Sequence, residues 1–393
     1  MQNKKSNYIM PTYGDRNIEF ETGKGCYLYT KNGEKYLDFG AGIAVNSLGH
    51  CHPKLVDVLT HQAQKLWHTS NLYFNKDQEE YAELLCNNSF AEKVFFCNSG
   101  VEAIECGIKV VRSYHNKLNQ NFKKNIITFE GAFHGRTFAA MSAQQDIKYY
   151  NGFEPLLSGF IKVPFNDLNF LKTTINENTA AILIEPIQGE GGIRPAKIDF
   201  LKNIKEICLK NNILLFFDEV QSGFGRSGKL FSYEWANIEP DIMAVAKGIG
   251  SGFPMGACMT TNKACIGMVK GTHGSTYGGN PLSVSIGKEV LKIIKDENFL
   301  QNVKNTSNYL WDCLKKLESK YSEIVEVRGA GLLLGIKTKN NNLLLSKALI
   351  KNKLLNVPAS DNVIRLVPPL IISNQEVDKA IKIIEFTLKE IND

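Results

Sequence analysis

Short apolar runs that alternate with helical segments restrict the fold of this chain more than any other sequence feature. Each run has five or six residues, is rich in Val, Ile, Leu and Phe, and is bounded by glycine, proline or polar residues. The runs are 93–97, 125–129, 180–185, 213–218 and 241–246. Strands buried on both faces of a mainly parallel sheet have this pattern. Helical spacing between the runs then predicts a doubly wound α/β domain.

The rest of the chain predicts a second, smaller unit, because 393 residues are too many for one simple domain. Residues 17–40 are predicted to form short strands joined by turns. Beyond residue 281, two long helical segments precede two strand-like ones: 282–296, 301–320, 324–327 and 331–337. We expect a small α+β domain that the early strands join. The predicted division is an N-terminal segment contributing to the small domain, the large domain and the C-terminal small domain, at 1–48, 49–281 and 282–393.

Composition and charge exclude several classes of function. The formal net charge is only +6 and charges of both signs are interspersed, so nucleic-acid binding is not expected. The nine cysteines include no C-x-x-C pair, which favours reduced thiols in a cytoplasmic protein. No metal site is expected, even at Cys51 between His50 and His52. We expect neither a signal peptide at the N-terminus nor a membrane span, since the longest apolar stretch is 213–217.

Chemically distinctive residues follow the predicted strands, at the edge where open α/β sheets bind ligands. Asp218 ends one apolar run and, once desolvated, needs a cationic or proton-sharing partner such as a protonated pyridine nitrogen. A helix cap or a structural ion pair is the alternative. Lys247 follows another run and precedes a glycine-rich segment. Burial would lower the pKa of its amine and free it to attack an aldehyde, whereas a lone lysine there more often extends to solvent.

Two further motifs lie after predicted strands. Ser99, Gly100 and Val101 open a predicted helix, whose free N–H groups would bind phosphate, although Ser99 could equally be a plain N-cap. In segment 131–137, Phe133 offers an aromatic face and Arg136 a guanidinium for a carboxylate; core packing and a surface ion pair are the alternatives. The role of His134 stays open. Each signal is weak alone, but four different chemical parts at strand ends together predict one ligand site.

These motifs resemble the class III, or ornithine-type, aminotransferases, which are pyridoxal 5'-phosphate (PLP) enzymes of fold type I. The lysine that follows DEVQ lies 29 positions beyond Asp218 (247 − 218), a specific spacing. Within the class, GIAVNSLGHCHP and AFHGRT are most similar to acetylornithine aminotransferases. The resemblance runs nearly end to end, through 11–14, 23–53, 97–105, 131–137, 184–192, 214–228, 241–257, 273–281, 328–335 and 363–370.

The resemblance implies a set of cofactor contacts. Lys247 would carry PLP as a Schiff base, and Asp218 would pair with the ring nitrogen. Gln221 would lie near the ring's phenolic oxygen, and Phe133 would stack on the ring. The phosphate would be held by backbone N–H groups and by Thr276 of the partner subunit, which implies a homodimer with shared active sites. The full set implied is Ser99, Gly100, Val101, Phe133, Asp218, Glu219, Val220, Gln221, Lys247 and Thr276.

The resemblance also implies substrate contacts. Arg136 would hold the α-carboxylate of the amino donor, with Ser275 close by, and Tyr13 is placed in the same set. Glu190 and Arg365 resemble a switch pair. In one half-reaction Glu190 would mask Arg365, which is then released to bind the α-carboxylate of glutamate or 2-oxoglutarate.

Two positions depart from the family pattern. Val101 replaces a threonine or alanine that many relatives have, so it lacks a hydroxyl that could bind the phosphate. Ile43 stands where ornithine δ-aminotransferases tend to have a tyrosine that contacts the free α-amine. The second departure favours an N-acylated substrate over ornithine.

The implied reaction is a ping-pong transamination, a step of arginine biosynthesis. It converts N2-acetyl-L-ornithine and 2-oxoglutarate to N-acetyl-L-glutamate 5-semialdehyde and L-glutamate. A sister ω-aminotransferase acting on succinylornithine, N-succinyl-diaminopimelate intermediates, ornithine, γ-aminobutyrate or lysine would share every cofactor residue. A non-catalytic PLP-binding or regulatory protein is the alternative of another class. A nicotinamide dehydrogenase is disfavoured, because no G-x-G-x-x-G follows the first strand of the α/β region.

Overall fold

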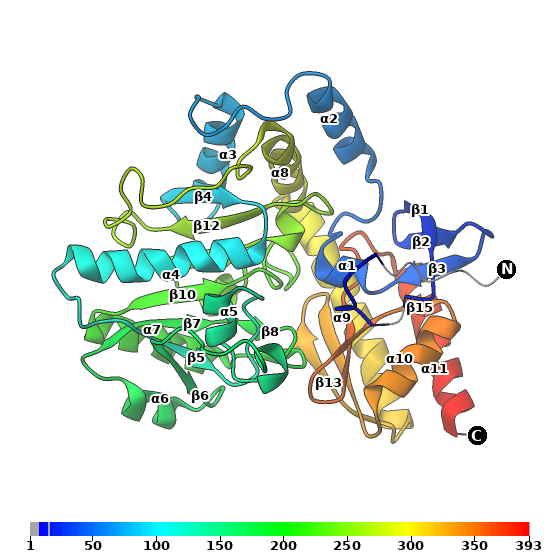
Figure 1. Cartoon of the computed structure of the whole chain (residues 1–393). Helices are drawn as coiled ribbons and strands as arrows, with labels where there is room; N and C mark the ends of the chain where they lie inside the picture. The colour runs from blue at the N-terminus through cyan, green and yellow to red at the C-terminus, as the bar shows by residue number, and fades with distance from the viewer. Residues whose placement is uncertain (1–7, 15, 393) are drawn as a thin grey trace.

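The five apolar runs form strands of a single seven-stranded sheet, on the left of Figure 1. The structure is a computed structural model that describes residues 8–14 and 16–392. Its sheet has the order β4-β12-β11-β10-β7-β5-β6. Only β12 is antiparallel to its neighbours, so the predicted mainly parallel sheet is confirmed. The strands are β4 (Lys93–Cys97), β5 (Asn125–Phe129), β6 (Phe160–Val163), β7 (Thr179–Ile184), β10 (Leu214–Asp218), β11 (Ile242–Val245) and β12 (Gly256–Thr260).

Two of these strands, β6 and β12, lack the apolar pattern that predicts the other five. β6 is an edge strand, and its four residues include Lys162, so it lacks a continuous apolar run. β12 has the sequence GACMT, which contains no aromatic residue and begins with glycine. Its five residues are nevertheless fully buried, because both neighbouring strands pair with it. Tertiary pairing therefore overrides weak local strand propensity.

Alternate residues of the central strands face opposite hydrophobic cores. In β10, Leu214 and Phe216 pack in the core beneath α4 (Gly100–Lys117), whereas Leu215 and Phe217 lie in the core that α7 (Ile198–Asn211) covers. Helices on both faces explain why the strands read as continuous apolar runs rather than as alternating patterns.

The second lobe, on the right of Figure 1, contains two four-stranded sheets. One sheet has the order β13-β14-β17-β16, with all neighbours antiparallel. The other joins the early strands to the C-terminal region, because β3 pairs in parallel with β15. The strands are β1 (Phe20–Lys24), β2 (Tyr27–Thr30), β3 (Lys35–Asp38), β13 (Ile324–Ala330), β14 (Leu333–Thr338), β15 (Leu354–Leu355), β16 (Val357–Ala359) and β17 (Val363–Leu366).

The β3–β15 pairing joins the N-terminal segment to the C-terminal region, and the domain bounds given above stay a prediction. The start of that segment, residues 1–7, lies outside the described residues. The helices of this lobe are α9 (Glu297–Lys320), α10 (Asn342–Lys351) and α11 (Asn374–Asn392).

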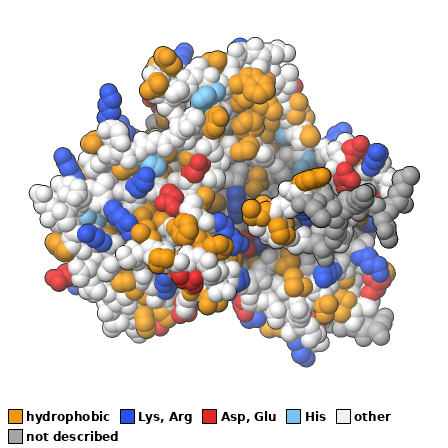
Figure 2. Space-filling model, viewed as in Figure 1, with side chains coloured by type: hydrophobic (Ala, Val, Ile, Leu, Met, Phe, Trp, Pro, Cys, Tyr) orange, Lys and Arg blue, Asp and Glu red, His pale blue; other side chains and the backbone are white. Residues whose placement is uncertain are grey.

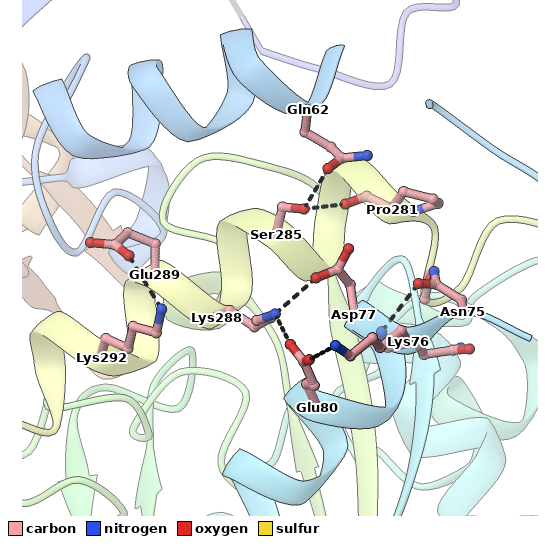
Figure 3. Close-up of polar contacts among 12 residues, drawn as sticks. Gln62, Asn75, Lys76, Asp77, Glu80, Pro281, Ser285, Lys288, Glu289 and Lys292 are labelled. Carbon is pink, nitrogen blue, oxygen red and sulfur yellow. Dashed lines mark hydrogen bonds and ion pairs between the residues drawn. The ribbon is translucent and has the colours of Figure 1, made fainter. Parts of the chain in front are cut away.

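A polar contact network joins three helices at the top of the large lobe: α2 (Pro53–Ala63), α3 (Lys76–Cys86) and α8 (Pro281–Ile294) (Figure 3). Lys288 of α8 lies between two carboxylates of α3, with its Nζ 2.8 Å from Asp77 Oδ1 and 2.5 Å from Glu80 Oε2. The hydroxyl of Ser285, also on α8, lies 3.3 Å from Gln62 Oε1 of α2. α8 thereby holds both α2 and α3, and the segment between those two helices, in place.

The remaining elements are short. They are α1 (Ala41–Ala44), α5 (Phe138–Ser142), α6 (Leu168–Thr174), β8 (Ile187–Gln188), β9 (Arg194–Pro195) and the 3-10 turns η1 (Ile147–Tyr149), η2 (Ser232–Trp235) and η3 (Lys247–Ile249). Among the residues that the structure describes, none of the helices has the length and apolar character needed to cross a bilayer.

We predict that Gly107→Ala destabilises the large lobe. A Cβ added at Gly107 of α4 would lie 2.1 Å from Cζ of Phe216, a fully buried ring of β10. Neither the helix nor the central strand can yield easily, so the free energy of unfolding should fall by about 1–3 kcal/mol. Urea unfolding would measure it, with Gly14→Ala as the matched control, because a methyl there meets no atom within 4 Å. Equal stability of the two variants would contradict the prediction.

Candidate active site

A cavity of about 450 Å³ lies at the carboxyl ends of the central strands. It collects residues that follow five different strands, as the sequence analysis expects of an open α/β sheet. Nine of the predicted site residues line it: Ser99, Gly100, Val101, Phe133, Arg136, Asp218, Val220, Gln221 and Lys247. Six others, treated below, do not: Tyr13, Glu190, Glu219, Ser275, Thr276 and Arg365.

One end of the cavity is the N-terminus of α4. The side chain of Ser99 caps this helix, since its hydroxyl accepts the N–H of Glu102 at 3.4 Å. The first N–H groups of the helix, those of Gly100 and Val101, have no partner within the helix, and both residues line the cavity. A Cβ at Gly100 would lie 2.7 Å from Val220, so only glycine fits this turn. Ser99 is thus an N-cap, and the backbone beside it can bind an anion.

The opposite side of the cavity holds a buried carboxylate and imidazole. Asp218 Oδ2 lies 2.7 Å from Nδ1 of His134, and Asp218 Oδ1 accepts the N–H of Val220 at 3.0 Å. Burial alone would lower the pKa of His134, but the hydrogen bond and the charge of Asp218 outweigh it and raise that pKa. His134 Nε2 has no hydrogen-bond partner among the described residues. This dyad gives Asp218 a fixed orientation and a proton-bearing neighbour.

Lys247 brings an amine into the same cavity. It begins η3 with a φ of 50°, a left-handed conformation that is strained for a residue with a side chain and typical of active sites. Burial lowers the pKa of its amine to about 8, and the nearby charge of Arg365 acts in the same direction. A substantial fraction of the amine is therefore neutral, and nucleophilic, near physiological pH.

Glu219, which the resemblance places in the cofactor set, faces away from the cavity. Its carboxylate does not line the cavity but accepts the N–H groups of Ser232 at 2.6 Å and Tyr233 at 2.8 Å. The reason is the alternation of side chains along an extended chain, which turns residue 219 away from the side that Asp218 and Val220 face. Burial raises the pKa of Glu219 to about 8. Its contacts hold η2 in place, and the structure gives no support for a direct cofactor contact.

Two guanidinium groups flank the cavity in different states. Arg136 is exposed, lies 5.5 Å above the ring of Phe133 and 4.6 Å above that of Tyr149, and has no ion pair among the described residues. Arg365, on β17 of the small lobe, is buried and forms an ion pair with Glu190 at 2.6 Å. Its Nη1 also lies 3.2 Å from Oε1 of Gln221. One guanidinium is open to a carboxylate, and the other is covered by one.

Three predicted residues lie elsewhere. Ser275 is held outside the cavity, where its carbonyl accepts the amide of Asn71 at 3.0 Å and its hydroxyl accepts the N–H of Gly278 at 2.9 Å. Thr276 is exposed. Tyr13 is 72% exposed, and its ring contacts Arg16 instead of the cavity. A single chain therefore does not bring these residues to the site.

Two residues at the cavity, His134 and Glu185, have no role predicted from the sequence. Glu185 lines the cavity and is buried, which raises the pKa of its carboxyl to about 7. The signal was present in the sequence, since Glu185 ends the run 180–185 just as Asp218 ends the run 213–218. The partner of His134 could not be read in the same way, because Asp218 is 84 residues away.

The cavity can hold a small aromatic aldehyde that carries a phosphate. The helix N-terminus suits the phosphate, Phe133 and Val220 are apolar surfaces for a ring, and Asp218 suits a protonated ring nitrogen. The neutral amine of Lys247 suits the aldehyde carbon. Among the described residues, no group of three His, Cys, Asp or Glu side chains could bind a metal ion.

Comparison with known proteins gives the same assignment. Residues 9–388 match the family described as aminotransferase class-III. The acetylornithine aminotransferase of Agrobacterium fabrum is 50% identical over 96% of this chain and 95% of its own length. The N-acetylornithine aminotransferase structure of Stenotrophomonas maltophilia is 35% identical, with a TM-score of 0.85, over 96% of this chain and 97% of that chain.

A second solved structure is that of the Toxoplasma gondii ornithine aminotransferase, in which PLP partly occupies the active site. It is 31% identical, has a TM-score of 0.93, and covers 97% of this chain and 92% of its own. Sequence identity, shared fold and a family match over nearly the whole length agree with the geometry of the cavity, and the chain belongs to the class III aminotransferases.

Proposed function

We propose that this chain transfers the δ-amine of N2-acetyl-L-ornithine to 2-oxoglutarate, giving N-acetyl-L-glutamate 5-semialdehyde and L-glutamate. One observation carries the proposal: the cavity has an open guanidinium at Arg136 and a second, Arg365, covered by Glu190. A ping-pong enzyme with two different substrates needs to bind one carboxylate in the first half-reaction and two in the second. A removable acidic cover on one arginine meets that need.

Class III aminotransferases use PLP, and the residues of the cavity fit it. When bound, this cofactor supplies an electron sink that stabilises negative charge at the carbon bearing the transferred amine. The N–H groups of Gly100 and Val101 would hold the phosphate, and Phe133 and Val220 would flank the ring. Asp218, oriented by His134 and by the N–H of Val220, would keep a proton on the ring nitrogen.

The chain's own residues would handle substrates and protons. Lys247 would remove the proton from the carbon that bears the transferred amine, because burial lowers the pKa of its Nζ to about 8 and so raises its neutral fraction near pH 7. Arg136 would bind the α-carboxylate of acetylornithine. Glu190 would turn away from Arg365 in the second half-reaction, leaving that guanidinium to bind the α-carboxylate of 2-oxoglutarate.

A homodimer is part of the proposal. Thr276 is exposed in its own chain. In a homodimer, Thr276 of one chain would reach the phosphate bound in the cavity of the other chain. The segment around it is firmly held, since Asn71 bonds the carbonyls of Ser275 and Gly278. Figure 2 shows hydrophobic side chains gathered at the top of the molecule, near α2, α3 and α8. Large exposed apolar side chains gathered in one place favour burial in an interface. Those of the segment between α2 and α3, and of the nearby segment 275–278, are Leu66, Trp67, Leu72, Tyr73, Phe74 and Tyr277.

A cytoplasmic location belongs to the same proposal. All nine cysteines are free thiols, five of them buried, which suits a reducing compartment.

The proposed substrate is tested by steady-state rates with a panel of ω-amino donors and 2-oxoglutarate as acceptor. We expect kcat/KM for N2-acetyl-L-ornithine to exceed that for L-ornithine and γ-aminobutyrate by roughly 10–100-fold. The other acylated donors are N2-succinyl-L-ornithine and N-succinyl-L,L-diaminopimelate. Their kcat/KM values show how strongly the rate depends on the identity of the acyl group. A higher kcat/KM with any other donor would assign the chain to a sister activity.

Replacement of the catalytic amine should abolish turnover without unfolding the protein. We expect Lys247→Ala to lower kcat by at least about 10³-fold, the scale on which loss of a general base acts. Far-ultraviolet circular dichroism should remain that of the wild type, because the side chain faces the cavity. Near-normal rates from the purified variant would refute the role of Lys247.

The lowered pKa of Lys247 predicts how cofactor uptake depends on pH. Burial disfavours the charged amine, so half of it should be neutral at pH about 8 instead of above 10. The rate constant for reconstitution of apoenzyme should rise about tenfold per pH unit below that value and level off above it. Stopped-flow absorbance of added PLP measures this rate constant. Lys247→Ala is the control, because it should lack the absorbance change that accompanies Schiff-base formation. A rate that still rises between about pH 9 and 10 would show an ordinary lysine.

A further inference from the structure

Glu185 is a buried carboxylate at the cavity that no step of the proposed reaction uses. It follows β7 and is 6% exposed. Its Oε2 accepts the N–H of Phe133 at 3.1 Å, and its Oε1 accepts the N–H of Gly189 at 3.2 Å. Phe133 lies in the loop after β5, and Gly189 follows β8 and directly precedes Glu190. One carboxylate therefore joins two separate loops through their main chains.

The loop that begins at Gly189 carries Glu190, whose carboxylate covers Arg365. Residues of the small lobe bind the main chain of this loop on the side away from Glu185. The N–H of Ser360 donates to the carbonyl of Glu190 at 3.0 Å. Arg328 Nε donates to the carbonyl of Gly192 at 2.8 Å. With Glu185 on the near side, the main chain of segment 189–192, hereafter the gate loop, is fixed from both lobes.

Close packing gives the gate loop little freedom. A Cβ at Gly189 would lie 2.3 Å from Nε2 of Gln221, and one at Gly191 would lie 2.4 Å from the carbonyl oxygen of Gly131. Both glycines are therefore pressed against neighbours that line or support the cavity. Only the side chain of Glu190, which is 23% exposed, has room to leave Arg365.

We propose that Glu185 is a positioning residue that ties the loop of Phe133 to the gate loop. It thereby fixes the position of the Phe133 ring relative to Glu190, the residue that covers Arg365. This inference rests on the proposed function, because it assigns the gate loop to the binding of the dicarboxylate acceptor. By holding the N–H of Gly189, Glu185 fixes the main chain from which the side chain of Glu190 swings. By holding the N–H of Phe133, it fixes the position of that aromatic ring. It contacts neither substrate carboxylate.

Replacing Glu185 by glutamine tests the two hydrogen bonds that its carboxylate accepts from Phe133 and Gly189. Both oxygens of a carboxylate accept hydrogen bonds, whereas a glutamine amide has one oxygen and one NH2 group. In Glu185→Gln the NH2 group must face one of the two N–H donors, so one loop loses its tether and is repelled. The size and shape of the side chain stay the same. The control is Glu323→Gln, which makes the same change in another buried carboxylate, one that lies away from the cavity and accepts the main-chain N–H and the side-chain amide of Asn340.

Two measurements on the holoenzyme read the two loops separately. Visible circular dichroism of the bound cofactor reports the asymmetry that Phe133 imposes on the ring. Isothermal titration with glutarate, a dicarboxylate that cannot be transaminated, reports access to Arg365. According to which N–H donor faces the NH2 group, we expect Glu185→Gln to alter the dichroism of the bound cofactor or to change the Kd of glutarate roughly tenfold, the scale of one lost hydrogen bond to a charged group. Glu323→Gln should lower the thermal midpoint but leave both readouts as in the wild type.

The inference is overturned if Glu185→Gln changes neither readout, or if Glu323→Gln changes the same readout equally. If Glu185→Gln does not accumulate as folded protein, Glu185→Asp takes its place. The aspartate keeps the charge but is one methylene shorter, so it can reach one N–H at most and must alter at least one readout. Failure of wild-type enzyme to use 2-oxoglutarate would instead sink the proposed function, and the dichroism would still decide whether Glu185 positions Phe133.

Discussion

All of the chemistry depends on one constraint, which is that parallel strands end at the same edge of a sheet. This edge brings Gly100, Phe133, Glu185, Asp218 and Lys247 together although 147 residues separate the first from the last (247 − 100). The strands behind it are apolar on both faces, so polar groups at their ends are desolvated. Burial moves the pKa of Lys247 down to about 8 and that of Glu185 up to about 7. The amine of Lys247 thus titrates near neutrality, as its work as a base requires.

The cavity is completed only where the two lobes meet. Arg365 comes from the small lobe, and its partners Glu190 and Gln221 come from the large one. Arg226 strengthens the same junction, because its buried Nη1 lies 3.0 Å from the carbonyl of Leu332 and 2.5 Å from that of Pro368. Burial lowers the pKa of this guanidinium to about 9. The loop that carries Asp218 is therefore held against the segment that follows Arg365.

Much of the site could be predicted from local sequence, and the exceptions have physical reasons. Asp218, Lys247 and Phe133 could be predicted because each lies at or just beyond the end of an apolar run and has a side chain whose chemistry is unusual there. The resemblance places Glu219 in the cofactor set, but its carboxylate binds the N–H groups of η2, because neighbouring residues of an extended chain point to opposite sides. The sequence left β12 unrecognised because pairing with two neighbours, not its own composition, makes it a strand.

The sequence by itself determined the types of the elements that have a clear apolar period, their order along the chain and the chemical groups at their ends. Those properties follow from periodicity and from the residue that ends each run, which are local. Only the tertiary structure decided the pairings: His134 with Asp218, Glu185 with Phe133, and Arg365 with Glu190. These partners lie 84, 52 and 175 residues apart. Their contacts depend on the register of the strands and on how the lobes close, which no local pattern encodes.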